Sequence, residues 1–216
     1  MSQSIETPQN IDQSGQEARI VAPKSLALSL IIGGFIAWIG AFSLVIERIQ
    51  LAEHPSGSLS CDLNVFISCK SVMLTWQSHL LGFPNPLIGV AGFAIPIVVG
   101  FAILAGARFA QWFWVAFVVG IGAAMAFILW LFSQSLLVIN VLCPYCMVSW
   151  VGTIMMFVPL ALFAFREDII EMPVRTTAFW DAAYPKAWLF VIGVDLLIVL
   201  AIVIRFWSRW PILFHG

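Results

Sequence analysis

Cys143 and Cys146 are separated by two residues and stand where a short polar turn leads into a long apolar run. Such a pair can close a small disulfide ring, and Pro144 suits the first turn of a following helix, where a missing N–H costs nothing. A cysteine at a helix N-terminus meets unpaired backbone N–H groups and the positive end of the helix dipole, which favour its thiolate and speed thiol–disulfide exchange. The pattern predicts a redox-active dithiol. The plainer alternative is a pair of small core residues.

The two remaining cysteines, Cys61 and Cys69, enclose seven residues in a hydrophilic stretch. This spacing avoids the strain of a vicinal pair and leaves the ring mobile in a loop, although cysteine number alone does not fix the connectivity. Four cysteines could instead bind a structural zinc ion. Only one Cys-x-x-Cys is present, however, and the other spacing is unusual for a zinc knuckle. We therefore expect redox exchange and no metal site.

The composition places these cysteines in a membrane protein. Hydrophobic residues make up 62% of the 216 residues and charged residues 10%, and the mean hydropathy is +1.01. Soluble domains of this size do not reach such values. The net charge is −1 and no basic patch is interleaved with aromatic residues. We therefore expect the protein to contact membrane lipid and not to bind nucleic acid.

Five apolar runs are long enough to cross a bilayer, because a helix rises about 1.5 Å per residue and the hydrocarbon core is about 30 Å thick. We expect them at residues 25–46, 86–105, 111–132, 143–165 and 187–204. The predicted fold is an all-α integral membrane protein, a bundle of four core transmembrane helices plus a fifth. The predicted divisions are a disordered cytoplasmic tail at 1–24, a catalytic bundle at 25–165, an extracytoplasmic loop at 47–84, a cytoplasmic loop at 166–186 and an extracytoplasmic tail at 205–216.

Within the first loop, the apolar residues between Val72 and Leu80 fall on one side of a helical wheel. This pattern predicts a short amphipathic helix that lies in the membrane interface. Asp195 falls inside the fifth apolar run, where a carboxyl group is costly. Three explanations are compatible with this position: Asp195 is protonated, it is hydrogen-bonded to another helix, or it contacts another chain.

The basic residues predict the orientation. With a cytoplasmic N-terminus, six Lys and Arg residues lie on the inner side and four on the outer side, which agrees with the positive-inside rule. Both cysteine pairs then lie on the outer, oxidising face of the cytoplasmic membrane, where disulfide chemistry is possible.

The order and spacing of the four cysteines resemble those of the vitamin K epoxide reductase family, and most closely its bacterial homologues that serve in disulfide formation. The similarity covers about Ser25 to Phe165. It rests on the segments Cys61-Asp62 to Ser68-Cys69, Thr75-Trp76, Phe83-Pro84-Asn85-Pro86-Leu87-Ile88-Gly89 and Cys143-Pro144-Tyr145-Cys146.

This resemblance implies roles for the four cysteines. Cys61 would exchange with the dithiol of a thioredoxin-fold partner, and Cys69 would pass the electrons on through a transient disulfide with Cys143. Cys146 would face a quinone, either menaquinone or ubiquinone. Bacterial family members often carry a thioredoxin-like domain after the fifth span, whereas this chain stops at Gly216. We therefore expect a separate extracytoplasmic partner, DsbA-like in character.

Three further positions follow from the same resemblance. Thr75 stands where the family has a Ser or Thr near the quinone, and its alternative is a solvated helix face. Asn85 matches an Asn that can hydrogen-bond a quinone carbonyl, and its alternative is a cap of the second span. Trp150 replaces a residue that is often Tyr in the animal enzymes, which removes a hydroxyl donor.

A different class of function remains open at this point. A transporter or an assembly subunit could carry the same cysteines as one static loop disulfide, with no catalysis.

Overall fold

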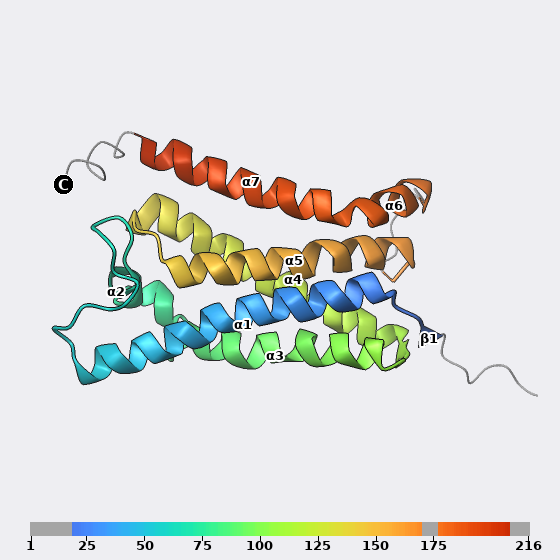
Figure 1. The fold of residues 1–216 in the computed structure, drawn as a ribbon, viewed down its shortest axis with the longest axis horizontal. Coiled ribbons are helices and arrows are strands. Elements are labelled where there is room, and N and C mark those ends of the chain that lie inside the picture. Colours follow the sequence, from blue (N-terminus) through green and yellow to red (C-terminus); the bar gives the residue numbers. More distant parts are fainter. Residues whose placement is uncertain (1–18, 170–176, 208–216) are drawn as a thin grey trace, which may run out of the picture.

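The computed structural model describes residues 19–169 and 177–207 of the chain. Five of the helical segments in these ranges are long and apolar enough to cross a membrane. The long helices are α1 (Lys24–Glu53), α3 (Asn85–Leu104), α4 (Gln111–Gln134), α5 (Pro144–Arg166) and α7 (Ala187–Phe206). They run side by side along one axis, as Figure 1 shows. The chain is an all-α integral membrane protein, as its composition predicted.

The shorter elements lie at the two ends of the bundle. At one end are α2 (Cys69–Met73), η1 (Trp76–His79) and the π-helical turn η2 (Ser135–Ile139). At the other end are β1 (Arg19–Ile20), β2 (Phe109–Ala110), α6 (Thr177–Ala183) and η3 (Tyr184–Lys186). Because successive long helices alternate in direction, both cysteine segments come to the same end of the molecule (Figure 1).

Helix α1 packs against both α3 and α5 along its length. The contact with α5 is close because glycine stands on both helices. A Cβ on Gly152 would lie 2.5 Å from the carbonyl oxygen of Gly33, and a Cβ on Gly40 would lie 2.7 Å from the carbonyl oxygen of Tyr145. Small residues allow membrane helices to approach until their backbones touch. The first turns of α5, which carry the Cys-x-x-Cys, are thereby fixed against α1.

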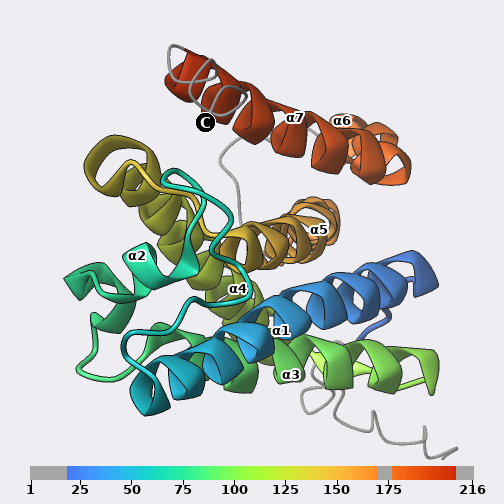
Figure 2. The same ribbon diagram turned by 60° about the vertical axis from the view of Figure 1, so that its left-hand side comes forward.

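Helix α7 lies on the outside of the bundle beside α5, as the turned view in Figure 2 shows. Most of its large side chains are exposed, which suits contact with lipid. Asp195 is part of this helix and is partly exposed.

Several boundaries differ from those expected from the sequence. Helix α1 continues to Glu53, so the loop expected to begin at residue 47 begins later. The amphipathic helix of the loop consists of two short pieces, α2 and η1, because the chain leaves the helical path at Thr75. The segment expected as a loop at 166–186 contains α6 and η3.

The expected tails fall mostly outside the described residues. Of the tail at 1–24, residues 19 and 20 form β1, which pairs antiparallel with β2 through Arg19 with Ala110 and Ile20 with Phe109. These two residues are therefore ordered, which the prediction of a disordered tail did not anticipate. The tail expected at 205–216 begins inside α7, and its residues after 207 lie outside the described part of the chain.

Candidate functional site: two cysteine pairs beside an apolar cavity

Cys61 and Cys69 are joined by a disulfide bond, and their Cα atoms lie 5.6 Å apart. Both are buried, with 4% of Cys61 and none of Cys69 exposed. Cys69 begins α2, and the side chain of Ser68 caps this helix by accepting a hydrogen bond from the N–H of Ser71. Such a cap satisfies one of the free N–H groups of the first turn. The local sequence thus fixes the direction in which Cys69 enters the core.

A backbone pairing holds this loop against the segment before α5. The N–H of Leu142 donates to the carbonyl of Phe66 at 2.8 Å, and the N–H of Ser68 donates to the carbonyl of Leu142 at 3.0 Å. Ile67 and Leu142 therefore form a parallel bridge. Since Ser68 precedes Cys69 and Leu142 precedes Cys143, the pairing brings these two cysteines together.

Cys143 and Cys146 form a dithiol at the start of α5. Cys143 is the residue before the helix, and its Sγ accepts a hydrogen bond from the N–H of Cys146 at 3.4 Å. The Sγ atoms of Cys143 and Cys146 lie 2.7 Å apart, and Sγ of Cys143 lies 3.6 Å from Sγ of Cys69. Cys143 is buried whereas Cys146 is partly exposed. The four sulfur atoms thus form one series, in which Cys69 and Cys143 are the inner members.

Asp62 organises the loop between its two cysteines. Its Oδ2 accepts from the N–H of Leu59 at 3.0 Å, and its Oδ1 accepts from the hydroxyl of Ser68 at 2.7 Å and the N–H of Lys70 at 3.1 Å. Burial by itself raises the pKa of this carboxyl. These hydrogen bonds, with one from the backbone of Cys69, outweigh burial and leave the pKa below its ordinary value of 3.8. Asp62 is therefore a carboxylate that spans both sides of the disulfide ring.

A second carboxylate, that of Glu47 in α1, reaches the residue before Cys61. Only 4% of Glu47 is exposed, and its carboxylate accepts hydrogen bonds from both the N–H and the hydroxyl of Ser60. The Ser60 oxygen also lies 3.1 Å from the hydroxyl of Tyr145, which belongs to the Cys-x-x-Cys. This chain of contacts links α1, the loop and α5 beside the cysteines.

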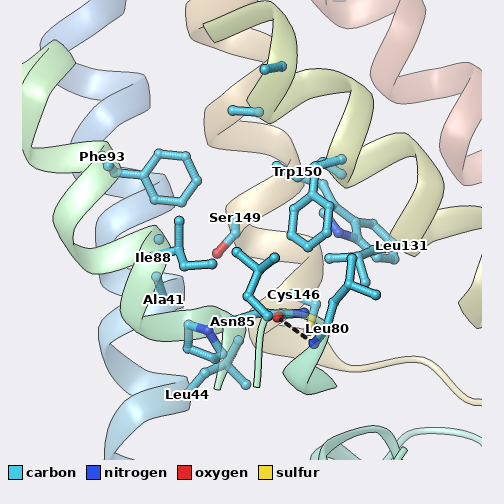
Figure 3. A pocket seen from close by; sticks show the side chains of 18 of the residues that line it. Ala41, Leu44, Leu80, Asn85, Ile88, Phe93, Leu131, Cys146, Ser149 and Trp150 are labelled. Atoms are coloured by element: carbon cyan, nitrogen blue, oxygen red, sulfur yellow. Dashed lines mark hydrogen bonds between the residues drawn. The ribbon is translucent and has the colours of Figure 1, made fainter. Parts of the chain in front are cut away.

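An apolar cavity of about 880 Å³ adjoins the dithiol. It is bounded by α1, α3, α4 and α5 and by loop residues between Val72 and Leu81, and Cys143 and Cys146 form part of its wall. Figure 3 shows Cys146, Ser149 and Trp150 of α5 facing it, opposite Ile88 and Phe93 of α3. Besides the cysteines and tryptophans, its polar side chains are those of Arg48, Gln77, Ser78, Asn85, Ser135 and Ser149.

The cavity remains open where α3 and α4 face it. A Cβ placed on Gly92 of α3 or on Gly120 of α4 would meet no atom within 4 Å. Both glycines line the cavity. A flat apolar molecule could therefore lie between these helices with one end against Cys146.

Residues 28–161, which carry all four cysteines, match the model of the vitamin K epoxide reductase family. The chain belongs to the vitamin K epoxide reductase family. A comparison with curated proteins found no significant match. As a member of this family with several apolar helices, the chain is a multi-pass membrane protein and a thiol oxidoreductase in general class.

The structure of this vitamin K epoxide reductase family member places Asn85 and Trp150 on the cavity wall. The side-chain N–H of Asn85 donates to the carbonyl of Gln77 at 2.6 Å, and its Oδ1 accepts from the N–H of Leu80 at 3.2 Å (Figure 3). Asn85 therefore ties the η1 segment to α3. It is itself the first residue of α3, and the cap position before the helix is held by Pro84, so Asn85 is not the cap of this span. Trp150 is 3% exposed, and its ring meets that of Phe132 edge-on.

Thr75 lies apart from these residues. It is not among the residues that line the cavity, and its hydroxyl donates to the carbonyl of Val72 at 2.7 Å. Its hydroxyl is thus occupied by the turn that separates α2 from η1.

Of the polar residues on the wall, only Asn85 was singled out from the sequence, and two of the others, Ser149 and Gln77, show why. Ser149 follows Cys146 by three positions and so shares its helix face, a spacing that could have indicated it. Its hydroxyl lies 3.2 Å from the carbonyl of Ala37 and 3.3 Å from that of Tyr145. Gln77 is 3% exposed, and its Nε2 donates to Oε1 of Gln134 at 3.3 Å. This contact joins residues 57 positions apart, and no local pattern could indicate it.

A structural zinc site was the alternative use of the four cysteines. Within residues 19–169 and 177–207, no group of three or more His, Cys, Asp or Glu side chains is placed to hold a metal ion. Two of the four sulfur atoms are bonded to each other in the loop disulfide.

Proposed function

We propose that this protein is a quinone-dependent oxidoreductase that generates disulfides for secreted proteins. It would oxidise the dithiol of an extracytoplasmic, DsbA-like partner of the thioredoxin fold and pass the electrons through its two cysteine pairs to a quinone. The observation that carries this proposal is the 3.6 Å distance between the sulfur atoms of Cys69 and Cys143, with Cys146 on the wall of the apolar cavity.

The residues around the cavity fit a quinone of the menaquinone or ubiquinone class. A quinone takes up two electrons and two protons, and its carbonyl oxygens gain negative charge as it is reduced. A mostly apolar wall accommodates the ring, and a few polar groups can stabilise that charge in a low-dielectric site. Asn85, Ser149 and the indole of Trp150 are the groups that would hold it, since each lines the cavity.

The internal exchange follows from the order of the sulfur atoms. With the loop pair reduced and the helix pair oxidised, the thiolate of Cys69 attacks Sγ of Cys143, which forms a Cys69–Cys143 disulfide and releases Cys146 as a thiolate. Cys61 then attacks Sγ of Cys69, which forms the loop disulfide and releases Cys143. Two electrons have moved from the loop pair to the helix pair.

The connectivity of the two pairs matches one step of this order. The loop pair is closed and the helix pair is a dithiol, which is the state expected after the internal exchange and before electrons leave for the quinone. Oxidation of Cys143 and Cys146 to a disulfide yields the two electrons and two protons that convert a quinone to a hydroquinone. Cys146, partly exposed beside the cavity, is the thiol placed to transfer them.

The topology supports an active site on the outer side of the cytoplasmic membrane. The ends of the elements that carry or adjoin Arg19, Lys24, Arg108, Arg166 and Lys186 lie opposite the cysteines, whereas those that carry Arg48, Lys70 and Arg205 lie at the cysteine end (Figure 1). This distribution favours a cytoplasmic location for the more basic end. The cysteines would then meet the oxidising side, where a DsbA-like partner operates.

The test is quinone reduction by the purified protein in lipid discs. Replacement of Cys146 by Ala should abolish reduction of added quinone by dithiol, while Val148→Ala, a change on the same helix at an exposed apolar position, should leave it intact. Thiols are counted by alkylation with and without quinone. A thiol count that does not respond to quinone would instead support a static disulfide in a non-enzymatic membrane protein.

A further inference from the structure

The outer end of α7 contacts the segment that leads into Cys143. Nε of Arg205 donates to the carbonyl of Leu136 at 3.1 Å, and Nη2 donates to Oδ1 of Asn140 at 2.5 Å. Asn140 ends η2 in the left-handed conformation, with φ of 56°, which Asn adopts more readily than most residues. One guanidinium thus holds both a carbonyl of the last helical turn and the side chain of the residue that turns the chain toward Cys143.

The next residue of α7, Phe206, packs against both of the loop segments that pair through Leu142. Phe206 is 4% exposed and lies in one apolar cluster with Leu136 and Leu142. Its ring centroid is 6.2 Å from that of Phe66, and the two rings meet edge-on. Phe66 and Leu142 are the residues whose backbones pair beside the cysteines. The end of α7 therefore touches the segment before Cys69 and the segment before Cys143.

These contacts contrast with the rest of α7. Most of the large side chains along this helix are exposed to the surroundings. The helix also lies outside residues 28–161, the part of the chain that matches the family. Its hydrogen bonds through Arg205 and its ring contact through Phe206 lie at the cysteine end, which indicates a role there beyond anchoring in lipid.

We propose that Arg205, together with Phe206, is a positioning residue for electron transfer from Cys69 to Cys143. It holds the segment from Asn140 to Leu142 in place, and Leu142 in turn fixes the loop so that the two sulfur atoms lie within reach. This inference rests on the proposed relay, because it gives α7 a function only if the two cysteines exchange.

The test measures how strongly the fold favours a Cys69–Cys143 bond. In the variant Cys61→Ser with Cys146→Ser, Cys69 and Cys143 are the only thiols left, since the chain has four cysteines. Oxidised glutathione accepts the two electrons, so that the two thiols form a disulfide and two molecules of reduced glutathione are released. The equilibrium ratio gives the effective concentration of one thiol at the other.

Arg205→Met in this background should lower the effective concentration about tenfold, a factor that corresponds to about 1.4 kcal/mol. The matched control is Arg166→Met. Arg166 also ties the C-terminal part of the chain to the bundle, through Asp181 at 2.9 Å, but at the opposite end. It should leave the effective concentration unchanged. Thermal unfolding of each variant shows that the measured population is folded.

Conservative changes separate positioning from general loosening. Asn140→Asp keeps an acceptor for Arg205 and tolerates a left-handed backbone, so it should retain the effective concentration. Arg205→Lys offers a single ammonium in place of the planar guanidinium and should retain only part of the effective concentration. An unchanged value for Arg205→Met, or an equal loss with Arg166→Met, would overturn the inference.

The same experiment distinguishes this inference from the proposed function. If no Cys69–Cys143 disulfide forms in the background without the Arg205 change, the relay itself fails. If the disulfide forms and depends on Arg205 but added quinone is not reduced by the unaltered protein, the positioning role stands and the electron acceptor was misassigned.

Discussion

Sγ of Cys143 lies 3.6 Å from Sγ of Cys69, although 74 positions separate the two residues in the chain. Cys69 is bonded to Cys61, and Cys143 lies 2.7 Å from Cys146. Exchange between the pairs therefore requires motion of only one sulfur toward another that is already in contact with it. The loop pairing through Leu142 creates this relationship, since it joins the residues immediately before both cysteines.

Removal of Cys61 should trap the transient bond between the pairs. In Cys61→Ser, the thiolate of Cys69 attacks Cys143 and releases Cys146, but Cys61, the thiol that would resolve the Cys69–Cys143 bond in the forward direction, is absent. We expect a Cys69–Cys143 disulfide to accumulate when the reduced protein is treated with quinone, detected by peptide mass spectrometry after alkylation. Cys69→Ser should give no such crosslinked peptide. A crosslink between Cys69 and Cys146 instead would contradict the assignment of Cys143 as the inner sulfur.

The two pairs should also differ in the reductants that they accept. When Cys61 and Cys69 are both replaced by Ser, the Cys143–Cys146 disulfide remains and its Cys146 is partly exposed, so quinone reduction driven by a small dithiol should persist. Reduction driven by a thioredoxin-fold dithiol protein should stop, because the pair that receives its electrons is absent. Both rates are measured from quinone absorbance in the same lipid discs. An equal loss with both reductants would exclude the proposed order of transfer.

Hydropathy and cysteine spacing were enough to predict the bundle, because spans of about 20 apolar residues have few other structures available to them. The alternating direction of the spans then places Cys69 and Cys143 at the same end of the molecule. Local signals also indicated the start of α5, where Pro144 follows Cys143. These features depend only on residues near one another in the chain.

Contacts between distant segments could not be predicted in this way. The helix expected from Val72 to Leu80 is interrupted, because the hydroxyl of Thr75 bonds to the carbonyl of Val72 and the chain then turns toward Asn85. Gln77 is buried by its contact with Gln134, and no periodicity in either segment indicates this pair. Polar residues between apolar ones look alike in a sequence, whether they face water or another helix.

Asn85 and Thr75 should behave differently when truncated. Asn85→Ala removes the side chain that ties Gln77 and Leu80 to α3 at the cavity wall. We expect KM for quinone to rise about tenfold, the effect of losing about 1.4 kcal/mol of binding. Thr75→Ala should change KM less than about twofold, because its hydroxyl bonds within its own turn and lies away from the cavity. A larger effect at Thr75 than at Asn85 would place the quinone on the loop side of η1.

Glu47 should hold the loop closed over Cys61. Glu47→Ala removes the carboxylate that accepts from the N–H and the hydroxyl of the exposed Ser60, so the loop loses both of its hydrogen bonds to α1 at this point. The loop disulfide should then be reduced faster by a water-soluble phosphine, measured by alkylation and mass spectrometry. Glu53→Ala, at an exposed position in the last turn of the same helix, serves as the control and should leave this rate unchanged. Equal rates for Glu47→Ala and the unaltered protein would show that the contact with Ser60 does not restrain the loop.

The loop should lose the contribution of Asp62 in acid. Hydrogen bonds to its carboxylate lower the pKa of Asp62 below 3.8 despite burial, so the folded loop favours the charged form. The stabilisation is therefore fully present above the pKa that Asp has in an unfolded chain, and it is lost as the pH falls through the lower pKa of the folded loop.

This sign can be measured with Asp62→Asn, which has one oxygen where the carboxylate uses two, toward Leu59 and toward Ser68 and Lys70. At neutral pH the loop disulfide of the variant should be reduced by phosphine faster than that of the unaltered protein. The ratio of the two rates cancels the pH dependence of the reagent, and it should fall toward one as the pH drops below 3.8. Asp181→Asn, at the far end of the bundle, should give a ratio near one throughout. A ratio for Asp62→Asn that stays constant in acid would mean that the charge of Asp62 does not stabilise the closed loop.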